Sequence, residues 1–127
     1  MITFENVTKR YNDNIGLENA SIQIDDGEFV FLVGPSGAGK STFIKLILKE
    51  INADNGSITV DDREITTMSS REIPYLRRSI GIVFQDFRLL PNKTVYENVA
   101  FAMEIVHKSQ RKIKRQVPLA LKLMGIS

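Results

Sequence analysis

The sequence predicts an α/β domain in which a buried parallel sheet lies beside a smaller antiparallel sheet. Residues 28–33 (EFVFLV) are a continuous apolar run bounded by turn residues, which is typical of a strand buried on both faces. Residues 40–51 carry apolar side chains at spacings of three and four, which predicts an amphipathic helix. Residues 2–7 and 20–24 alternate between apolar and polar side chains, which predicts two strands of the antiparallel sheet.

The remaining expected elements are shorter or less regular. In chain order they are a strand at 57–60, a helix at 70–78, a strand at 80–84 and helices at 94–106 and 109–124. Proline interrupts two of these helices, at Pro74 and Pro118, where a bend or a shorter helix is expected. The pattern Thr94-x-x-Glu97 is a capping box, and Gly125 marks the end of the last helix.

Composition excludes several classes of protein. The chain has 127 residues, enough for one domain with a core, and its net charge of +2 gives no general reason to expect a nucleic-acid partner. The absence of cysteine excludes a disulfide scaffold and a thiolate metal site. The N-terminal sequence has no apolar segment of the secretory type, and the longest apolar runs are far too short to span a membrane. Any work at a membrane is therefore expected at its surface, through a partner.

The most informative segment is GPSGAGKS, at residues 34–41. Its pattern Gly34-x-x-x-x-Gly39-Lys40-Ser41 matches the phosphate-binding loop G-x-x-x-x-G-K-[ST], with a predicted strand before it and a helix after it. Glycine lets successive N–H groups turn inward around an anion, and the start of the helix adds its dipole. A Gly-rich surface turn is the alternative, but these four positions match by chance in about one window in 10⁴.

A guanine-nucleotide protein is disfavoured among the classes that use this loop. Such a protein needs the base-reading pattern N-K-x-D, and Asn92-Lys93 is followed by Val95 where the aspartate must stand. The segment is better interpreted as the start of a capped helix.

Two positions outside the loop are further candidates. Tyr11 follows the first strand in a polar stretch and is able to stack on a nucleotide base, although packing within its own loop is the simpler alternative. Gln85 ends the apolar segment 80–84, and open α/β sheets bind ligands at the carboxyl ends of their strands. Simple solvation of the strand end explains Gln85 equally well.

Taken together, KRY at 9–11, GPSGAGKS at 34–41 and VFQDFRLLPNKTVYENV at 83–99 resemble the ATP-binding subunit of ABC transporters. The part from residue 83 onward looks most like the branch of that family that acts in bacterial cell division. ATPases of lipoprotein and macrolide export share the pattern less closely. The resemblance covers essentially all of residues 1–127. It implies a P-loop NTPase (RecA-like) core with an antiparallel β subdomain in about 1–86 and the start of a helical subdomain in about 87–127, incomplete at the C-terminus.

The resemblance also implies a role for each matching residue. Tyr11 stacks on the adenine of ATP, Lys40 is the main cationic contact to the phosphates, and Ser41 ligates Mg²⁺. Gln85 contacts Mg²⁺ or the attacking water, so Lys40 and Gln85 are the expected catalytic residues. The expected phosphate-binding residues are Gly34, Pro35, Ser36, Gly37, Ala38, Gly39, Lys40, Ser41 and, toward the α-phosphate, Thr42. Residues 87–97 are expected to form the groove that receives a helix from a membrane partner.

The family pattern further implies partners, and it exposes what this chain lacks. A homodimer of ATPase domains is expected beneath an integral membrane subunit, at the cytoplasmic face of the bacterial plasma membrane. The chain contains no LSGGQ-type signature, no apolar strand ending in Asp-Glu (Walker B) after Gln85, and no switch histidine, since its single histidine, His107, comes too early. We expect the N-terminal part of an ATPase of ~200 or more residues, inactive alone. An exporter ATPase and a non-hydrolysing nucleotide-binding fragment remain alternatives.

Overall fold

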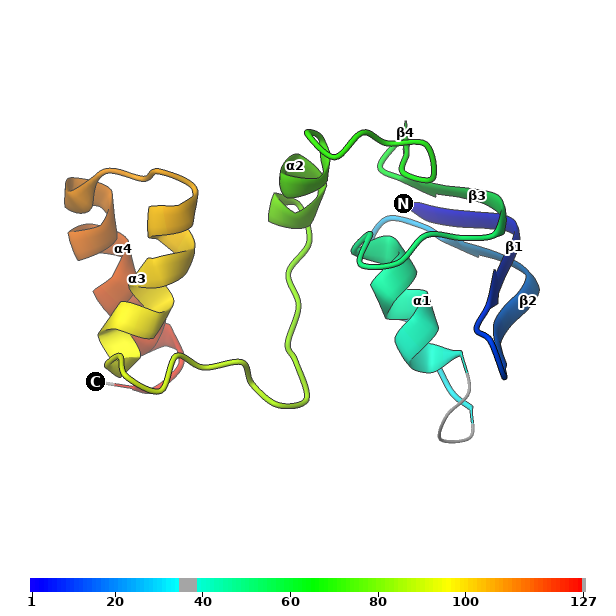
Figure 1. The fold of residues 1–127 in the computed structure, drawn as a ribbon. Coiled ribbons are helices and arrows are strands. Elements are labelled where there is room, and N and C mark those ends of the chain that lie inside the picture. The colour runs from blue at the N-terminus through cyan, green and yellow to red at the C-terminus, as the bar shows by residue number, and fades with distance from the viewer. Residues whose placement is uncertain (35–38, 127) are drawn as a thin grey trace. The chain divides into compact units, whose positions relative to one another are not determined.

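The computed structural model describes residues 1–34 and 39–126. The chain divides into two compact units, Met1–Gly81 and Ile82–Ser127, and each is described by itself (Figure 1). The elements are β1 (Ile2–Arg10), β2 (Ile15–Ile24), α1 (Lys40–Ile47), β3 (Asn55–Val60), β4 (Arg63–Glu64), α2 (Ile73–Arg78), α3 (Val95–Ile105) and α4 (Gln110–Leu123). None of the helices within the described ranges has the length and apolar character that crossing a membrane requires.

The first unit contains a four-stranded antiparallel sheet in the order β2-β1-β3-β4. The strands expected at 2–7 and 20–24 are confirmed as parts of β1 and β2, which pair with Ile2 opposite Ile24. β3, which contains the strand expected at 57–60, pairs with the other edge of β1. The prediction of a small antiparallel sheet is therefore correct.

A bulge in β1 brings two apolar side chains to one face. Strict alternation would place Phe4 and Val7 on opposite faces, but the register shifts between them and Asn6 has a φ of 49°. Both side chains are consequently buried. In β3, Gly56 has a φ of +88°, and a Cβ at that position would overlap the backbone oxygen of Asn6. Glycine is therefore required beside the bulge.

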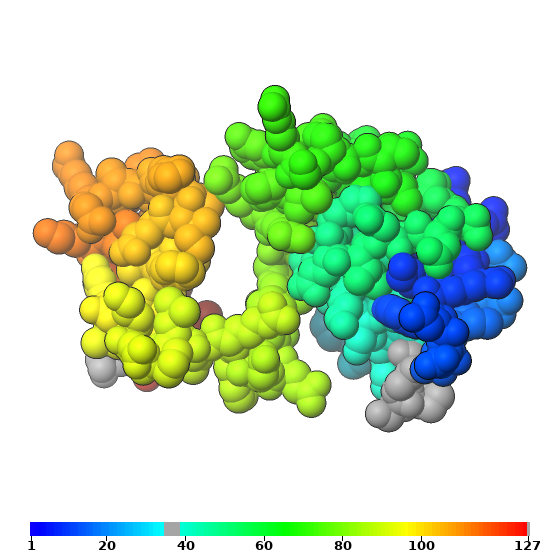
Figure 2. Space-filling view, in the orientation of Figure 1, coloured from blue at the N-terminus to red at the C-terminus, as the bar shows by residue number. Residues whose placement is uncertain are grey.

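Helix α1 packs its apolar face against this sheet, and on the face drawn in Figure 2 its atoms lie directly against those of β1. The ring of Phe43 stacks on that of Phe4 with centroids 4.5 Å apart. Helix α2 adds Leu76 to the same cluster, and Pro74 occupies the first turn of that helix, where proline is tolerated. The buried cluster comprises Phe4, Val7, Phe43, Leu46, Ile47, Ile58, Val60, Ile65 and Leu76.

The helix expected over 40–51 ends earlier, at Ile47. Lys49 has a φ of 59°, which a continuing helix does not allow. The guanidinium of Arg77 donates from Nε to the backbone oxygen of Leu48 over 2.9 Å, which satisfies a carbonyl that the helix end leaves free.

Replacing Phe43 with alanine is expected to lower the free energy of unfolding by about 3–5 kcal/mol, because it leaves a cavity against Phe4. Ile44→Ala is the matched control on the same helix, since Ile44 is 41% exposed and loses far less burial. Urea titration of both variants tests this. Equal losses of stability in the two variants would contradict the packing described.

The buried strands predicted at 28–33 and 80–84 are wrong for this structure. Neither segment forms a strand within the described residues, and both are exposed, with Phe29 at 83% and Val83 at 91%. A parallel strand exists only through hydrogen bonds to neighbouring strands and through cover on both faces. No such neighbour is paired with either segment among the described residues. The apolar pattern indicates that these segments are suited to a buried sheet, but the described residues do not form one.

The second unit is a hairpin of α3 and α4, which lie side by side and antiparallel (Figure 1). Both predicted helices are confirmed to within one residue at each end. The capping box is present, since the backbone N–H of Glu97 donates to Thr94 and the Glu97 side chain accepts from the Thr94 N–H. Ala100, Ile113 and Val117 form the buried seam between the helices.

Candidate functional site

The glycine-rich loop leads directly into α1. Gly39 occupies the position before the first turn of α1, where no side chain caps the helix and no acidic residue follows. The first N–H groups of such a helix have no acceptor within it, so they are available to an anion. The ammonium of Lys40 donates to the backbone oxygen of Gly34 over 2.7 Å, which brings the charge to the start of the loop. The expected phosphate contacts at 35–38 (Pro35, Ser36, Gly37, Ala38) lie outside the described residues.

The next two residues of α1 have different surroundings. Ser41 is exposed, beside Lys40 in the first turn, whereas Thr42 is buried at 5% exposure. A serine hydroxyl is a hard oxygen ligand of the kind that Mg²⁺ accepts together with phosphate oxygens and water. The surroundings of Ser41 therefore fit the metal-binding role that the sequence predicts for it.

The structure brings Tyr11 to this same helix. The Tyr11 hydroxyl lies 3.0 Å from Thr42 Oγ1, although the two residues are far apart in the sequence. The Tyr11 backbone exchanges hydrogen bonds with Asn14 in the turn between β1 and β2, which fixes where the side chain leaves the chain. The side chain remains 42% exposed. Tyr11 is thus more than a loop-packing residue, because it joins the strand turn to the start of α1.

Two glycines that sequence reasoning did not connect make this approach possible. A Cβ on Gly16 would lie 2.8 Å from Thr42 Oγ1 and 2.9 Å from Cε2 of Tyr11. A Cβ on Gly39 would overlap the backbone oxygen of Gly16 and come within 2.5 Å of Leu17 Cδ2. Sequence analysis missed Gly16, because the strand that it predicts begins at residue 20, whereas β2 begins at Ile15. A glycine inside a strand is a known sign of close backbone approach.

Gln85 belongs to the second unit and lies in a turn-rich segment. Its neighbours Phe84, Asp86 and Arg88 line an open hollow with it. The Arg88 guanidinium lies over the Phe84 ring, 3.9 Å from its centroid, and 3.8 Å from a carboxylate oxygen of Asp86. Gln85 therefore stands beside both an acidic and a basic side chain. Within the described residues, no group of three or more acidic or histidine side chains is placed to hold a metal ion.

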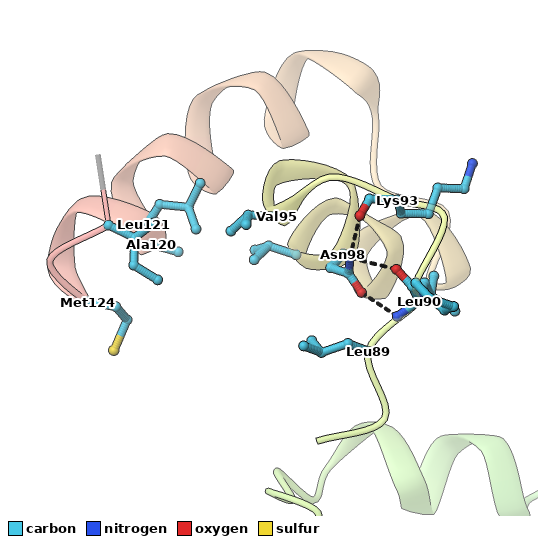
Figure 3. A pocket seen from close by; sticks show the side chains of 11 residues that line it. Leu89, Leu90, Lys93, Val95, Asn98, Ala120, Leu121 and Met124 are labelled. Atoms are coloured by element: carbon cyan, nitrogen blue, oxygen red, sulfur yellow. Dashed lines mark hydrogen bonds between the residues drawn. The ribbon is translucent and has the colours of Figure 1, made fainter. Parts of the chain in front are cut away.

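An apolar cavity of about 710 Å³ opens in the second unit (Figure 3). Leu89, Leu90 and Val95 contribute to it from the segment before and at the start of α3, and Leu121 and Met124 contribute from the end of α4. This cavity includes part of the segment 87–97 in which sequence analysis expects a groove for a membrane partner.

Asn98 fixes the loop that borders this cavity, and sequence analysis missed it. Its side-chain oxygen accepts from the N–H of Leu90 over 2.7 Å. Its amide nitrogen lies 2.9 Å from the carbonyl oxygen of Thr94 and 3.3 Å from those of Leu90 and Lys93, which share its two N–H groups. Figure 3 shows the contacts with Leu90 and Lys93. The sequence offered one sign of this role for Asn98, which is an asparagine in the first turn of a helix that follows a proline-containing loop.

Comparison with known proteins shows strong similarity. The family model described as "ABC transporter" matches residues 17–127. The cell division ATP-binding protein FtsE of Streptococcus pneumoniae is 46% identical over 127 residues, covering 99% of this chain and 55% of the relative. FtsE of Mycobacterium tuberculosis is 47% identical over 129 residues, covering 100% of this chain and 56% of the relative. The chain thus spans about half the length of the curated relatives it matches.

Two solved structures of an ABC transporter cassette are also similar to this chain. The dimeric structure of MJ0796, a bacterial ABC transporter cassette, superposes with a TM-score of 0.87 at 32% identity, covering 100% of this chain and 58% of that one. A post-hydrolysis state of the same cassette, bound to ADP and Pi, gives a TM-score of 0.86 at 31% identity.

Proposed function

We propose that this chain, which belongs to the ABC transporter family, is the nucleotide-binding part of an ATPase that acts in bacterial cell division. The family predicted from the sequence is confirmed, and so is the ABC-cassette fold with its antiparallel sheet, although the strands predicted for the parallel sheet are not formed in the described residues. The single observation that carries the proposal is the phosphate-binding loop, in which Lys40 stands at the uncapped start of α1. The cell-division assignment is supported by several relatives named FtsE, including one from Bacillus subtilis at 47% identity.

Each site residue has a physical task in this proposal. The N–H groups at the start of α1 donate to phosphate oxygens, and Lys40 exchanges its contact with Gly34 for the β- and γ-phosphates. Ser41 holds Mg²⁺, which neutralises phosphate charge when bound. Tyr11 stacks on the adenine, and Gln85 acts near the γ-phosphate. Phosphoryl transfer depends mainly on positioning the reacting groups and on stabilising their charge. These residues bind and position the nucleotide, and Lys40 offsets part of the phosphate charge.

The proposed partners follow from the same family. We propose that a homodimer of the ATPase works at the cytoplasmic face of the plasma membrane with an integral membrane subunit of the FtsX type. The apolar cavity beside α3 supports this, because its lining of leucine, valine and methionine suits an apolar helix. Purifying the complex from cells and identifying the membrane subunit distinguishes this assignment from an exporter ATPase. Recovery of a transport permease in place of an FtsX-type subunit would overturn it.

The chain of residues 1–127 is expected to hydrolyse ATP at a negligible rate. It contains the phosphate-binding loop but not the Asp-Glu pair that supports Mg²⁺ and the attacking water in the family. Phosphate release measured for this chain, and for the longer natural protein that we propose, tests the expectation. Turnover by the 127-residue chain that disappears in Lys40→Ala would refute it.

A further inference from the structure

The contact between Tyr11 and Thr42 has no explanation in phosphate binding alone. Thr42 is buried, and its hydroxyl lies 3.0 Å from that of Tyr11. A hydroxyl can accept one hydrogen bond and donate another. If Tyr11 donates, the Thr42 proton stays available for a second acceptor. The contact therefore joins Tyr11, the proposed stacking partner of the base, to Thr42 at the start of α1.

The Tyr11 ring has two further close neighbours, Gly16 and Lys9. At its edge, Gly16 leaves just enough space, since a Cβ would lie 2.9 Å from Cε2. Over its face, the ammonium of Lys9 lies 5.7 Å from the ring centroid, within the range of a cation–π interaction. Asp54 holds this end of β1, because it pairs with Lys9 at 3.7 Å and accepts from the N–H of Arg10 over 2.6 Å. The ring is thus held at its hydroxyl and over one face, with Gly16 leaving room at its edge, yet it remains 42% exposed.

We propose that Thr42, Gly16 and Lys9 are positioning residues that keep the Tyr11 ring at a fixed place relative to the start of α1. This inference rests on the proposed function, in which Tyr11 stacks on the base. A ring that is ordered before binding costs less entropy when a ligand stacks on it. The arrangement favours a ligand that carries both an aromatic base and a phosphate chain over a ligand with the phosphate chain alone. The Tyr11–Thr42 hydrogen bond couples these two parts of the site.

The test is a double-mutant cycle in the full-length natural protein, with ATP and inorganic tripolyphosphate as the two ligands. Tyr11→Phe keeps the ring and removes only the hydroxyl. It is expected to weaken ATP binding about 3- to 10-fold, as the loss of one hydrogen bond predicts, and to leave tripolyphosphate binding unchanged. Thr42→Val is expected to weaken both ligands. In the Thr42→Val background, Tyr11→Phe is expected to have no further effect on ATP.

Two more variants separate positioning from mere packing. Thr42→Ser keeps the hydroxyl and is expected to restore the sensitivity of ATP binding to Tyr11→Phe. Gly16→Ala places a Cβ 2.8 Å from Thr42 Oγ1 and 2.9 Å from Cε2 of Tyr11, so it is expected to weaken both ligands. The loss is expected to be larger for ATP, because only ATP also depends on the position of the ring. A purely structural role would lower the affinity for both ligands equally.

Four outcomes overturn the inference. ATP affinity that is unchanged in Tyr11→Phe, or equal losses in the wild-type and Thr42→Val backgrounds, would show that the hydrogen bond does not act on the base. Equal weakening of ATP and tripolyphosphate by Gly16→Ala would assign Gly16 to packing. A wild-type protein that binds neither ligand would overturn the proposed function, and this inference with it.

Discussion

Replacing Lys40 with alanine is expected to lower ATP affinity at least ~100-fold and to abolish turnover in the full-length protein. Hydrogen bonds to charged groups contribute about 1.5–3 kcal/mol each, and one lysine contacting two phosphates supplies more than one of them. The ammonium already lies at the loop, 2.7 Å from the Gly34 oxygen. Titration calorimetry with ATP and a phosphate-release assay measure the two effects.

Lys45→Ala is the matched control for this substitution. Lys45 lies in the last turn of α1, exposed, and carries the same charge away from the loop. Its replacement is expected to leave ATP affinity within about twofold, since an exposed charge a full turn or more away is largely screened. Wild-type affinity in Lys40→Ala, or equal losses in both variants, would remove Lys40 from the site.

Replacing Gly39 with alanine is expected to lower the free energy of unfolding of the 127-residue chain by about 3 kcal/mol, at the upper end of what overpacking costs. The added Cβ would overlap the backbone oxygen of Gly16, and backbone in a paired strand cannot move aside cheaply. The same displacement separates β2 from the start of α1, so ATP affinity is expected to fall as well. Urea unfolding followed by circular dichroism measures the loss of stability.

Gly81→Ala is the control, because a Cβ at Gly81 meets no atom within 4 Å. It is expected to change the stability of the same chain by less than about 1 kcal/mol. A Gly39→Ala variant as stable as Gly81→Ala would mean that Gly39 serves only the conformation of the loop and not the contact with β2.

Local signals predicted much of the fold correctly. The capping box at Thr94, the apolar spacing of α4 and the strand β1 depend on neighbours within a few residues, and all three appear in the structure. The alternation that predicts β1 is broken by its bulge between Phe4 and Val7. The strands at 28–33 and 80–84 are predicted from short apolar runs, which report nothing about pairing. Their pairing depends on strands elsewhere, so the sequence of the segment itself cannot decide whether a strand forms.

In the candidate site, too, the local part could be predicted from the sequence and the long-range contacts could not. The phosphate-binding loop is a contiguous pattern whose glycines and lysine have separable physical reasons, so the sequence could indicate it. The contact of Tyr11 with Thr42 and the close approach of Gly16 to Gly39 join β-strand to helix across a long stretch of chain. No periodicity reports such contacts, because they depend on how β2 packs against α1.

Titration of ATP with Mg²⁺ into the full-length natural protein, in parallel with its Lys40→Ala variant, tests the central claim most directly. The claim is that residues 34–42 form a phosphate-binding site for ATP. We predict saturable binding of one ATP per chain, competed by ADP and by inorganic tripolyphosphate, and lost in Lys40→Ala. Absence of binding to the wild-type protein, or binding that Lys40→Ala leaves unchanged, would contradict it.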